Sequence, residues 1–110
     1  LHIHSFGKYA SYDVSDTDMT PEKIIDEAIK ENISVISITD HNEIGNIPAA
    51  LDYAEGKNIL VIPGVELSTS QGHFLVYFET YEKIRSFIGE LTITPDKKQC
   101  DTTITGALDI

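Results

Sequence analysis

Short apolar runs alternate along this chain with longer segments in which apolar residues recur every three or four positions. The short runs predict β-strands at Leu1–Ser5, Ser34–Ile38, Ile59–Ile62 and His73–Phe78. The longer segments predict amphipathic helices that begin near Pro21, near Ile47 and at Tyr81, the last ending near Leu91. This alternation of strands and helices is typical of an α/β fold built on a mainly parallel sheet.

The first two helix boundaries follow from residues that favour helix ends. Thr20 can cap the first helix and Pro21 fits its first turn, so we expect about 11 helical residues from that point. Asn46 and Pro48 flank the start of the second helix, and Gly56 can end it.

The predicted sheet has one strongly apolar strand and one unusually short connection. The strand at Ser34–Ile38 is almost continuously apolar, which is expected when both faces of a sheet are covered. Glu66 and His73 are separated by too few residues for a right-handed crossover helix, which takes about a dozen or more. Either Gln71-Gly72 turns a hairpin there, or the fold lacks one helix. The region from Thr92 to Thr105 has a mixed pattern and receives no assignment.

Charge and cysteine content narrow the classes of function. The formal net charge of −10 argues against binding of nucleic acid through counterion release alone. It is compatible with a phosphate substrate, because two or three divalent ions would reverse the local field. The single cysteine, Cys100, excludes an internal disulfide and favours a reducing cytoplasm. No apolar run approaches the roughly 18 residues that span a bilayer, so we expect no membrane association.

The histidines show the clearest chemical pattern. All four lie in or beside the predicted strands, with three carboxylates beside or between them: His2, His4, His41 and His73, with Asp16, Asp40 and Glu66. Residues two apart on a strand share a face, so His2 and His4 can point at one ion. Sites in parallel α/β folds form at the carboxyl ends of strands, where these side chains would meet. Imidazoles and carboxylates together suit borderline divalent metals.

Each motif alone has a plainer explanation. An isolated His-x-His on an apolar strand is more often a buried, hydrogen-bonded pair, and a lone Asp-His after a strand is more often a turn. Gly64-Val65-Glu66 could end a strand with a solvated acid, and Asp16 in its acidic loop could be solvated. Their occurrence together, in this order, favours a multinuclear metal site in which the two oxygens of Glu66 bridge two ions.

These residues resemble the motifs of the polymerase and histidinol phosphatase (PHP) superfamily of metal-dependent phosphoesterases. The first motif is similar to Leu1–Ser5, followed by Ser15-Asp16 and the helix start Thr20-Pro21. The second resembles Ile38–Asn42 and the third Ile62–Ser68, and the likeness continues to His73 and Tyr77. Thr17 stands where the family's loop often has a glycine.

The resemblance implies a distorted β/α barrel with seven strands, of which this chain holds only the first part. Residues 1–110 would be the N-terminal part of a single PHP domain, with the motifs in 1–78 and a helix and an unassigned segment in 79–110. Two or three divalent ions (zinc, manganese or iron) would bind. His2 and His4 would hold the first ion, and Glu66 would bridge it to a second ion on His73. Asp16 and His41 would hold a third, and Asp40 would accept a proton or orient a ligand.

The implied activity is hydrolysis of a phosphate ester by a metal-bound hydroxide, formed from a water whose pKa is lowered toward roughly 7. The substrate would be a phosphomonoester, a nucleotide or a nucleic-acid end. Two alternatives remain open. The chain could be an accessory PHP domain of a larger protein, such as an ATPase of the chromosome-segregation type or a DNA polymerase. It could also be a non-catalytic module stabilised by metal.

Both ends of the chain suggest an excerpt of a longer polypeptide. The sequence begins inside a predicted strand, and Gly106–Ile110 reads as the first turn of a helix. Because four strands cannot close a barrel, we expect further strands, with at least one more histidine after an apolar strand and an Asp-x-His or similar pair. Further domains in the parent protein are also possible on this view.

Overall fold

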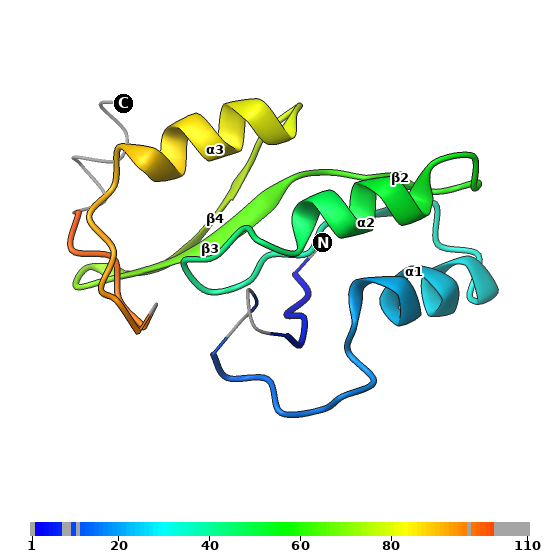
Figure 1. Ribbon diagram of the computed structural model, residues 1–110, viewed down its shortest axis with the longest axis horizontal. Helices are drawn as coiled ribbons and strands as arrows, with labels where there is room; N and C mark the ends of the chain where they lie inside the picture. Colours follow the sequence, from blue (N-terminus) through cyan, green and yellow to red (C-terminus); the bar gives the residue numbers. More distant parts are fainter. Residues whose placement is uncertain (1, 8–9, 11, 97, 103–110) are drawn as a thin grey trace.

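The computed structural model describes residues 2–7, 10, 12–96 and 98–102. Three helices and four strands follow one another along this part of the chain (Figure 1). The helices are α1 (Pro21–Lys30), α2 (Ile47–Ala54) and α3 (Tyr81–Gly89). The strands are β1 (Val35–Ile36), β2 (Leu60–Val61), β3 (Gly64–Thr69) and β4 (Gly72–Tyr77). The chain is therefore a small mixed α/β structure.

The predicted strands at Ser34–Ile38 and Ile59–Ile62 lie side by side and parallel. Val35 in β1 is opposite Leu60 in β2. The same register continues further along, where His41 forms an isolated parallel bridge with Glu66. Pro63 lies between these two points, and it has no N–H to donate to a ladder. The two strands are thus found where the sequence predicts them, as a ladder interrupted at the proline.

The predicted first strand is reduced to a single point of pairing. Ile3 forms an isolated parallel bridge with Ile38, and its carbonyl oxygen accepts a hydrogen bond from the Thr39 amide at 2.6 Å. Leu1 lies outside the described residues. The strand predicted at Leu1–Ser5 is therefore limited, in the described residues, to this one parallel bridge. This contact is still enough to bring the N-terminal segment against the middle of the sheet.

The short connection before His73 is a hairpin, one of the two alternatives left open by the sequence. β3 and β4 are antiparallel, with Glu66 opposite Leu75 and Ser68 opposite His73. Gly72, at the start of β4, has a φ of 120°, which favours glycine. The expectation of a mainly parallel sheet therefore fails at this point, because too little chain is available for a crossover.

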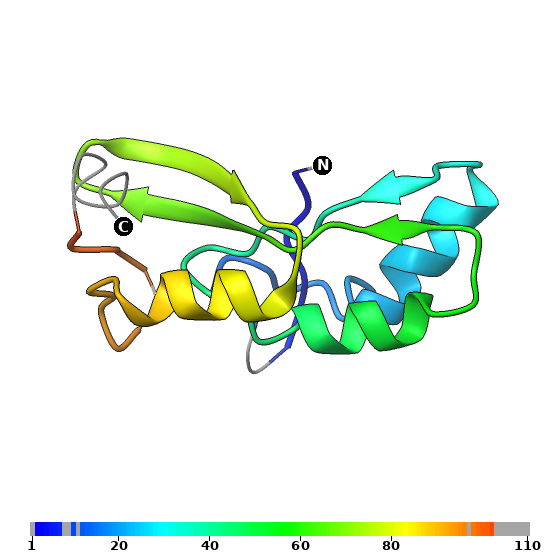
Figure 2. The ribbon, with the colours of Figure 1, turned by 90° about the horizontal axis from the view of Figure 1, so that it is seen from above.

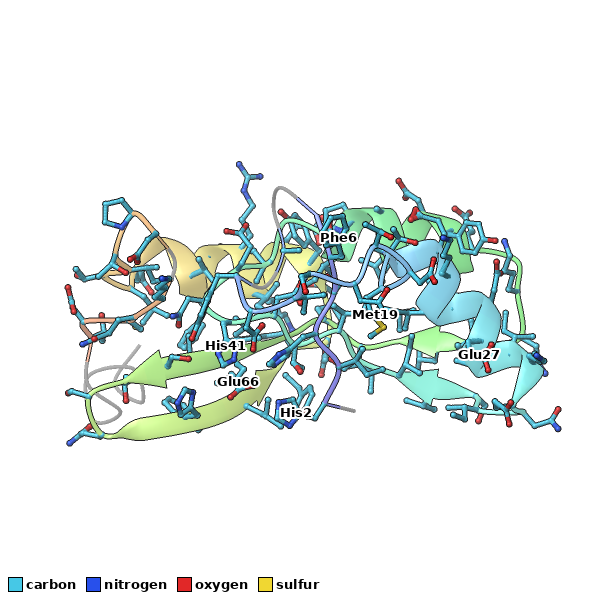
Figure 3. All side chains as sticks on the ribbon, turned by 90° about the horizontal axis from the view of Figure 1, so that it is seen from below. His2, Phe6, Met19, Glu27, His41 and Glu66 are labelled. Atoms are coloured by element: carbon cyan, nitrogen blue, oxygen red, sulfur yellow. The ribbon has the colours of Figure 1, made fainter. Side chains whose placement is uncertain are left out.

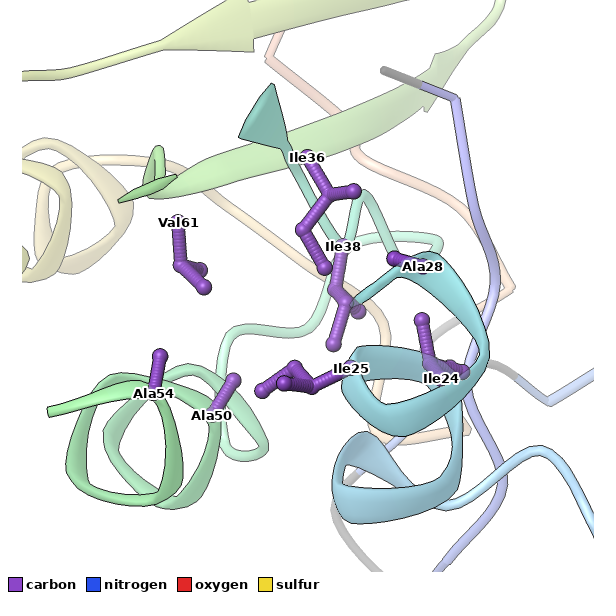
Figure 4. Packing of buried hydrophobic residues seen from close by; sticks show 8 residues of the cluster. All are labelled: Ile24, Ile25, Ala28, Ile36, Ile38, Ala50, Ala54 and Val61. Carbon is purple, nitrogen blue, oxygen red and sulfur yellow. The ribbon is translucent and has the colours of Figure 1, made fainter. Parts of the chain in front are cut away.

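Two apolar clusters fix these elements. In the first, α1 and α2 pack against the parallel strands through the buried residues shown in Figure 4: Ile24, Ile25, Ala28, Ile36, Ile38, Ala50, Ala54 and Val61. In the second, Ile84 of α3 packs against Val65 and Leu67 of β3. α2 and α3 lie on the same side of the strands (Figure 2). The strands therefore have one face on the helices.

The opposite face of β1 and β2 is open, which corrects the expectation that both faces are covered. Val35 is 39% exposed and Leu60 is 59% exposed, whereas Ile36 and Val61 are buried against the helices. The described residues form two two-stranded sheets joined by isolated bridges, without a closed barrel. None of the helices in this part of the chain is long and apolar enough to cross a membrane.

The first helix begins with the predicted cap. The Thr20 side chain accepts a hydrogen bond from the Lys23 amide, and Pro21 is the first residue of α1. Thr80 caps α3 in the same way, through the Lys83 amide. Residues 92–96 and 98–102, in the region that received no assignment from sequence, return to β3, where Cys100 forms isolated bridges with Thr69 and Ile93.

Candidate metal centre

Glu66 carries the carboxylate around which the candidate site is built. The sequence predicts a position past the end of a strand, but Glu66 lies inside β3. Its backbone pairs with His41 on one side and with Leu75 on the other. Its side chain is only 9% exposed. The side chains of Glu66, His41 and His2 come together beside β3 (Figure 3).

The N-terminal segment supplies two imidazoles to one oxygen of this carboxylate. The Nε2 atom of His2 lies 2.6 Å from Glu66 Oε1, and the Nε2 atom of His4 lies 2.8 Å from the same oxygen. Their spacing of two residues puts both rings on one side of the segment, as expected for an extended chain. The position of this segment is set by the bridge between Ile3 and Ile38.

Asp13 joins His4 to His41. Its Oδ2 atom lies 3.2 Å from His4 Nδ1 and 3.2 Å from His41 Nε2. His41 is buried at the end of the parallel ladder, and its ring centroid is 4.4 Å from that of His4. Asp13 comes from the loop before α1, so this carboxylate closes the loop over the site.

Ser68 joins His41 to His73 from the other side. The Ser68 Oγ atom lies 2.7 Å from His41 Nδ1 and 2.9 Å from His73 Nδ1. His73 Nδ1 is also 3.3 Å from Glu66 Oε2, the carboxylate oxygen that His2 and His4 do not contact. His73 faces Ser68 because the two are directly opposite across the hairpin. Both oxygens of Glu66 are therefore engaged by imidazoles.

Asp40 lies behind this cluster and holds the N-terminal segment. Its two oxygens accept hydrogen bonds from the amide and the hydroxyl of Ser5, each at 2.5 Å. Asn46, the residue before α2, donates to the Ser5 hydroxyl at 2.9 Å and to the carbonyl of Phe6. Asp40 is 2% exposed. These contacts make it a buried anchor for the strand that carries His4.

The pKa values favour the forms of Glu66 and His41 that bind metal. Burial raises the pKa of Glu66, but hydrogen bonds with His4 and His2 outweigh this effect and leave that pKa below its usual value. Burial lowers the pKa of His41, which keeps the imidazole neutral. Burial also raises the pKa of Asp40 to about 6, against the effect of the hydrogen bonds from Ser5.

Three overlapping groups of these side chains could each hold an ion. They are His2, His4 and Glu66; His4, Asp13 and His41; and His41, Glu66 and His73. In each group the possible ligand atoms lie within 4.8 Å of one another. A set of neutral imidazoles with anionic carboxylates suits zinc, manganese or iron. The residues present therefore fit a divalent metal centre.

Sequence reasoning reached most of this cluster but selected a different carboxylate in the loop. Asp16 is exposed, accepts a hydrogen bond from the Asp18 amide at 2.9 Å, and lies outside all three groups. Its role as a ligand stays a prediction. Asp13 and Ser68 were not selected. An acid in the loop after His-x-His was the available signal for Asp13, whereas a serine in a strand gives no comparable signal.

A cluster of imidazoles and carboxylates on a mixed α/β framework defines a candidate divalent-metal domain. The family model described as the PHP domain matches residues 1–105. The chain therefore belongs to the PHP domain family, as the sequence motifs indicated.

Relatives with known names include two enzymes that act on phosphate esters. The chain is 39% identical over 71 residues to the 5'-3' exoribonuclease Rnm of Salmonella typhimurium, covering 63% of this chain and 22% of that protein. It is 32% identical over 77 residues to a 3',5'-nucleoside bisphosphate phosphatase of Chromobacterium violaceum, covering 70% of this chain and 25% of that protein. An uncharacterized protein of Methanocaldococcus jannaschii is 29% identical over 103 residues, or 90% of this chain and 60% of that protein. The chain thus spans less than two thirds of each relative.

Proposed function

We propose that the parent protein of this chain is a metal-dependent phosphoesterase, and that the cluster around Glu66 is part of its active site. One observation carries the proposal. Glu66 presents one oxygen to His2 and His4 and the other to His73, at distances of 2.6 to 3.3 Å. A buried carboxylate with imidazoles on both oxygens is suited to bridge two ions.

The two groups that share Glu66 can each hold an ion at the same time. The remaining group, His4–Asp13–His41, cannot hold a further ion while they do. A neutral imidazole has one lone pair for a metal, so neither His4 nor His41 can serve two ions at once. The groups His2–His4–Glu66 and His41–Glu66–His73 share only the carboxylate, which has two oxygens. We therefore assign two ions to the described residues. Asp13 contacts both His4 and His41 and so fixes the orientation of these rings.

Ions bound here would supply an activated water as the nucleophile and would neutralise charge on the phosphoryl oxygens. The chain's own residues position this chemistry. Asp40 holds Ser5 through two hydrogen bonds and thereby fixes His4 against Glu66. Its observed contacts support a positioning role, and its predicted role as a proton acceptor remains a second proposal. The substrate class that we favour is a nucleotide or a nucleic-acid end, because the named relatives act on RNA and on a nucleoside bisphosphate.

The proposal is tested on the full-length parent protein, reconstituted with manganese, zinc or iron. We expect hydrolysis of p-nitrophenyl phosphate or of a nucleotide that disappears with a chelator and returns with metal. Glu66→Ala and His4→Ala should each lower turnover at least a hundredfold and reduce bound metal measured by elemental analysis. Glu79→Ala is the matched control, since Glu79 is an exposed carboxylate just before α3 whose ion pair, among the described residues, is with Lys83.

Two results would contradict the proposal. If Glu66→Ala keeps near-full turnover with normal metal content, the bridging role is wrong. If the reconstituted wild-type protein binds two ions but hydrolyses no phosphate ester, the non-catalytic metal-stabilised module becomes the better account. Asp40→Asn separates the two roles of this residue, because loss of positioning should lower bound metal and turnover together, whereas loss of a proton acceptor should lower turnover alone.

A further inference from the structure

Tyr12 forms an exposed aromatic wall beside the candidate metal centre. It precedes Asp13, whose carboxylate contacts His4 and His41, so its backbone is tied to the site. The Tyr12 ring centroid lies 5.3 Å from that of His41, and the two planes are inclined by 42°. The residue is 46% exposed. A large aromatic side chain, about half exposed to solvent, thus lies beside the buried candidate metal ligand His41.

Lys98 lies over the same ring, and hydrogen bonds hold the turn that carries it. Its Nζ atom is 5.6 Å from the centroid of Tyr12. The turn that carries it is closed by hydrogen bonds from the Thr94 amide to the Gln99 carbonyl and from the Lys98 amide to the Asp96 carboxylate. Two residues later, the Cys100 amide donates to the Ser68 carbonyl at 2.6 Å. Lys98 is therefore anchored to the strand that bears Glu66 and Ser68.

Tyr12 and Lys98 add an aromatic ring and a positive charge to the edge of the acidic metal centre. Glu66 and Asp13 are negative, and the whole chain carries a net charge of −10, so a substrate with more than one phosphate meets repulsion outside the ions. A lysine at the edge offsets this repulsion for a phosphate that is not the one hydrolysed. The neighbouring tyrosine ring offers a face on which a nucleobase can stack once the long Lys98 side chain turns from the ring to the phosphate.

We propose that Tyr12 and Lys98 form a substrate-recognition wall for a nucleotide: the base packs on Tyr12, and a phosphate other than the reacting one binds Lys98. This inference rests on the proposed phosphoesterase function and names the substrate class of that same site. The shared chemistry is a base with a second phosphate, which a free nucleoside bisphosphate and a 5'-phosphorylated oligonucleotide both provide.

The chain offers a matched pair of the same residue types away from the centre. Lys57 lies over Tyr53 at a closer 4.1 Å, and the Tyr53 hydroxyl donates to Asp26 while Lys57 donates to the Tyr53 carbonyl. Through Asp26, that pair links α1 to α2, and its hydrogen bonds in the described structure involve none of the candidate metal ligands. Tyr53→Leu and Lys57→Gln therefore control for loss of a partly buried ring and of a surface charge away from the site.

The experiment uses the metal-loaded full-length protein with four probes: glycerol phosphate, adenosine 5'-monophosphate, adenosine 3',5'-bisphosphate and a 5'-phosphorylated tetranucleotide. Tyr12→Leu should raise KM for the three adenine-containing or base-containing probes about tenfold and leave glycerol phosphate within twofold. Lys98→Gln should raise KM about tenfold for the bisphosphate or the tetranucleotide but not for the monophosphate. If the rise in KM is larger for the bisphosphate, the substrate is a free nucleotide. If it is larger for the tetranucleotide, the substrate is a nucleic-acid end. The two control variants should change no KM by more than twofold.

Calorimetric binding of adenosine 3',5'-bisphosphate to the same variants separates this proposal from the function on which it rests. If the protein hydrolyses none of the probes but Tyr12→Leu and Lys98→Gln each weaken binding about tenfold, the phosphoesterase proposal fails and the recognition wall stands. If both variants bind and turn over every probe as the wild type does, the wall is wrong whatever the activity. Equal losses for glycerol phosphate and for the nucleotides would also overturn it, since they would show a general effect on the site.

Discussion

Asp13 and Asp16 belong to the same acidic loop, but they have different surroundings. Asp13 contacts His4 and His41, whereas Asp16 is exposed and accepts a hydrogen bond from the Asp18 amide. We therefore expect Asp13→Asn to lower metal affinity about 10- to 100-fold, as losses of groups that orient metal ligands do. Asp16→Asn should change the affinity less than twofold. Competition with a metallochromic indicator measures both, and the reverse order of effects would support the predicted role of Asp16 as a ligand.

Ser68 gives a second prediction for a single side chain. Its hydroxyl contacts the Nδ1 atoms of both His41 and His73 and so fixes the orientation of two rings. Ser68→Ala should lower metal affinity about 10- to 100-fold, and Ser68→Thr, which keeps the hydroxyl, should restore most of it. Ser37→Ala is the control, because Ser37 is buried directly after β1 but donates to the Ile62 carbonyl. A tighter affinity in Ser68→Ala would mean that Ser68 competes with the metal for the Nδ1 atoms.

The residues that sequence could identify are those whose type itself signals chemistry. The imidazoles of His2, His4 and His41 are recognisable because histidine is uncommon beside apolar strands. The choice between Asp13 and Asp16 depends on the path of a loop, which local pattern does not determine. Ser68 depends on the pairing of β3 with β4, which puts it opposite His73. Contacts made by chain pairing at long range lie beyond a reading of motifs.

At the scale of the elements, β3 begins at Gly64 in close contact with its neighbours. A Cβ added there would overlap the Ser37 hydroxyl and would also lie 2.9 Å from a Thr39 methyl carbon and 3.0 Å from the Tyr77 ring. Gly64→Ala should therefore destabilise the fold by about 1–3 kcal/mol, as overpacking of a core does. Urea unfolding measures the change in free energy. Because Gly64 begins β3, we also expect metal affinity to fall as Glu66 shifts.

Gly89→Ala provides a control of opposite sign for this prediction. Gly89 is the last residue of α3, and a Cβ added there meets nothing within 4 Å. Replacing a helical glycine by alanine should stabilise the protein by up to about 0.5–1 kcal/mol. If Gly64→Ala were as stable as the wild type while Gly89→Ala behaved as expected, the close packing at the start of β3 would not matter to the fold.

The helices were predicted more closely than the strands for a physical reason. α1 begins at Pro21, as predicted, because Thr20 and Pro21 act on neighbouring residues alone. Strand length depends on a partner elsewhere in the chain, and the segment around Ile3 has one point of pairing with Ile38 in the described structure. The hairpin could be listed among the alternatives from chain length, but its pairing needed the structure.

At the scale of the whole molecule, metal should act as a stabilising ligand. An ion that binds only the folded state adds about 2.7 kcal/mol at a concentration 100 times its Kd. The melting temperature of the full-length protein should therefore rise by several degrees with manganese or zinc at about pH 7.5. The rise should be largely lost at about pH 5.5, since free histidine gains a proton below roughly pH 6.5 and protonated imidazoles do not bind metal. Equal shifts at both pH values, measured by calorimetry, would contradict histidine ligation.

The exposed apolar face of β1 and β2 is consistent with the expectation of further strands in the parent protein. Val35 and Leu60 are exposed on the side away from the helices, and the chain spans between 22% and 60% of the length of the relatives described above. The seven-stranded barrel and the additional ligands stay predictions. If further strands cover this face in the parent protein, amide hydrogens of β1 and β2 should exchange more slowly there than in residues 1–110 alone.

The contact between His2 and Glu66 spans 64 positions of the sequence, and α1, β1, α2 and β2 all lie between them. Closing so large a loop has an entropic cost that falls only once the intervening helices and strands have packed. The ligands therefore assemble late, after the framework exists, in contrast to small zinc modules in which the metal drives folding. In a growing chain on the ribosome, an ion could not be captured by this pair until β3 had been synthesised. Metal supply would then limit how much of the protein is active before it limits how much of it folds.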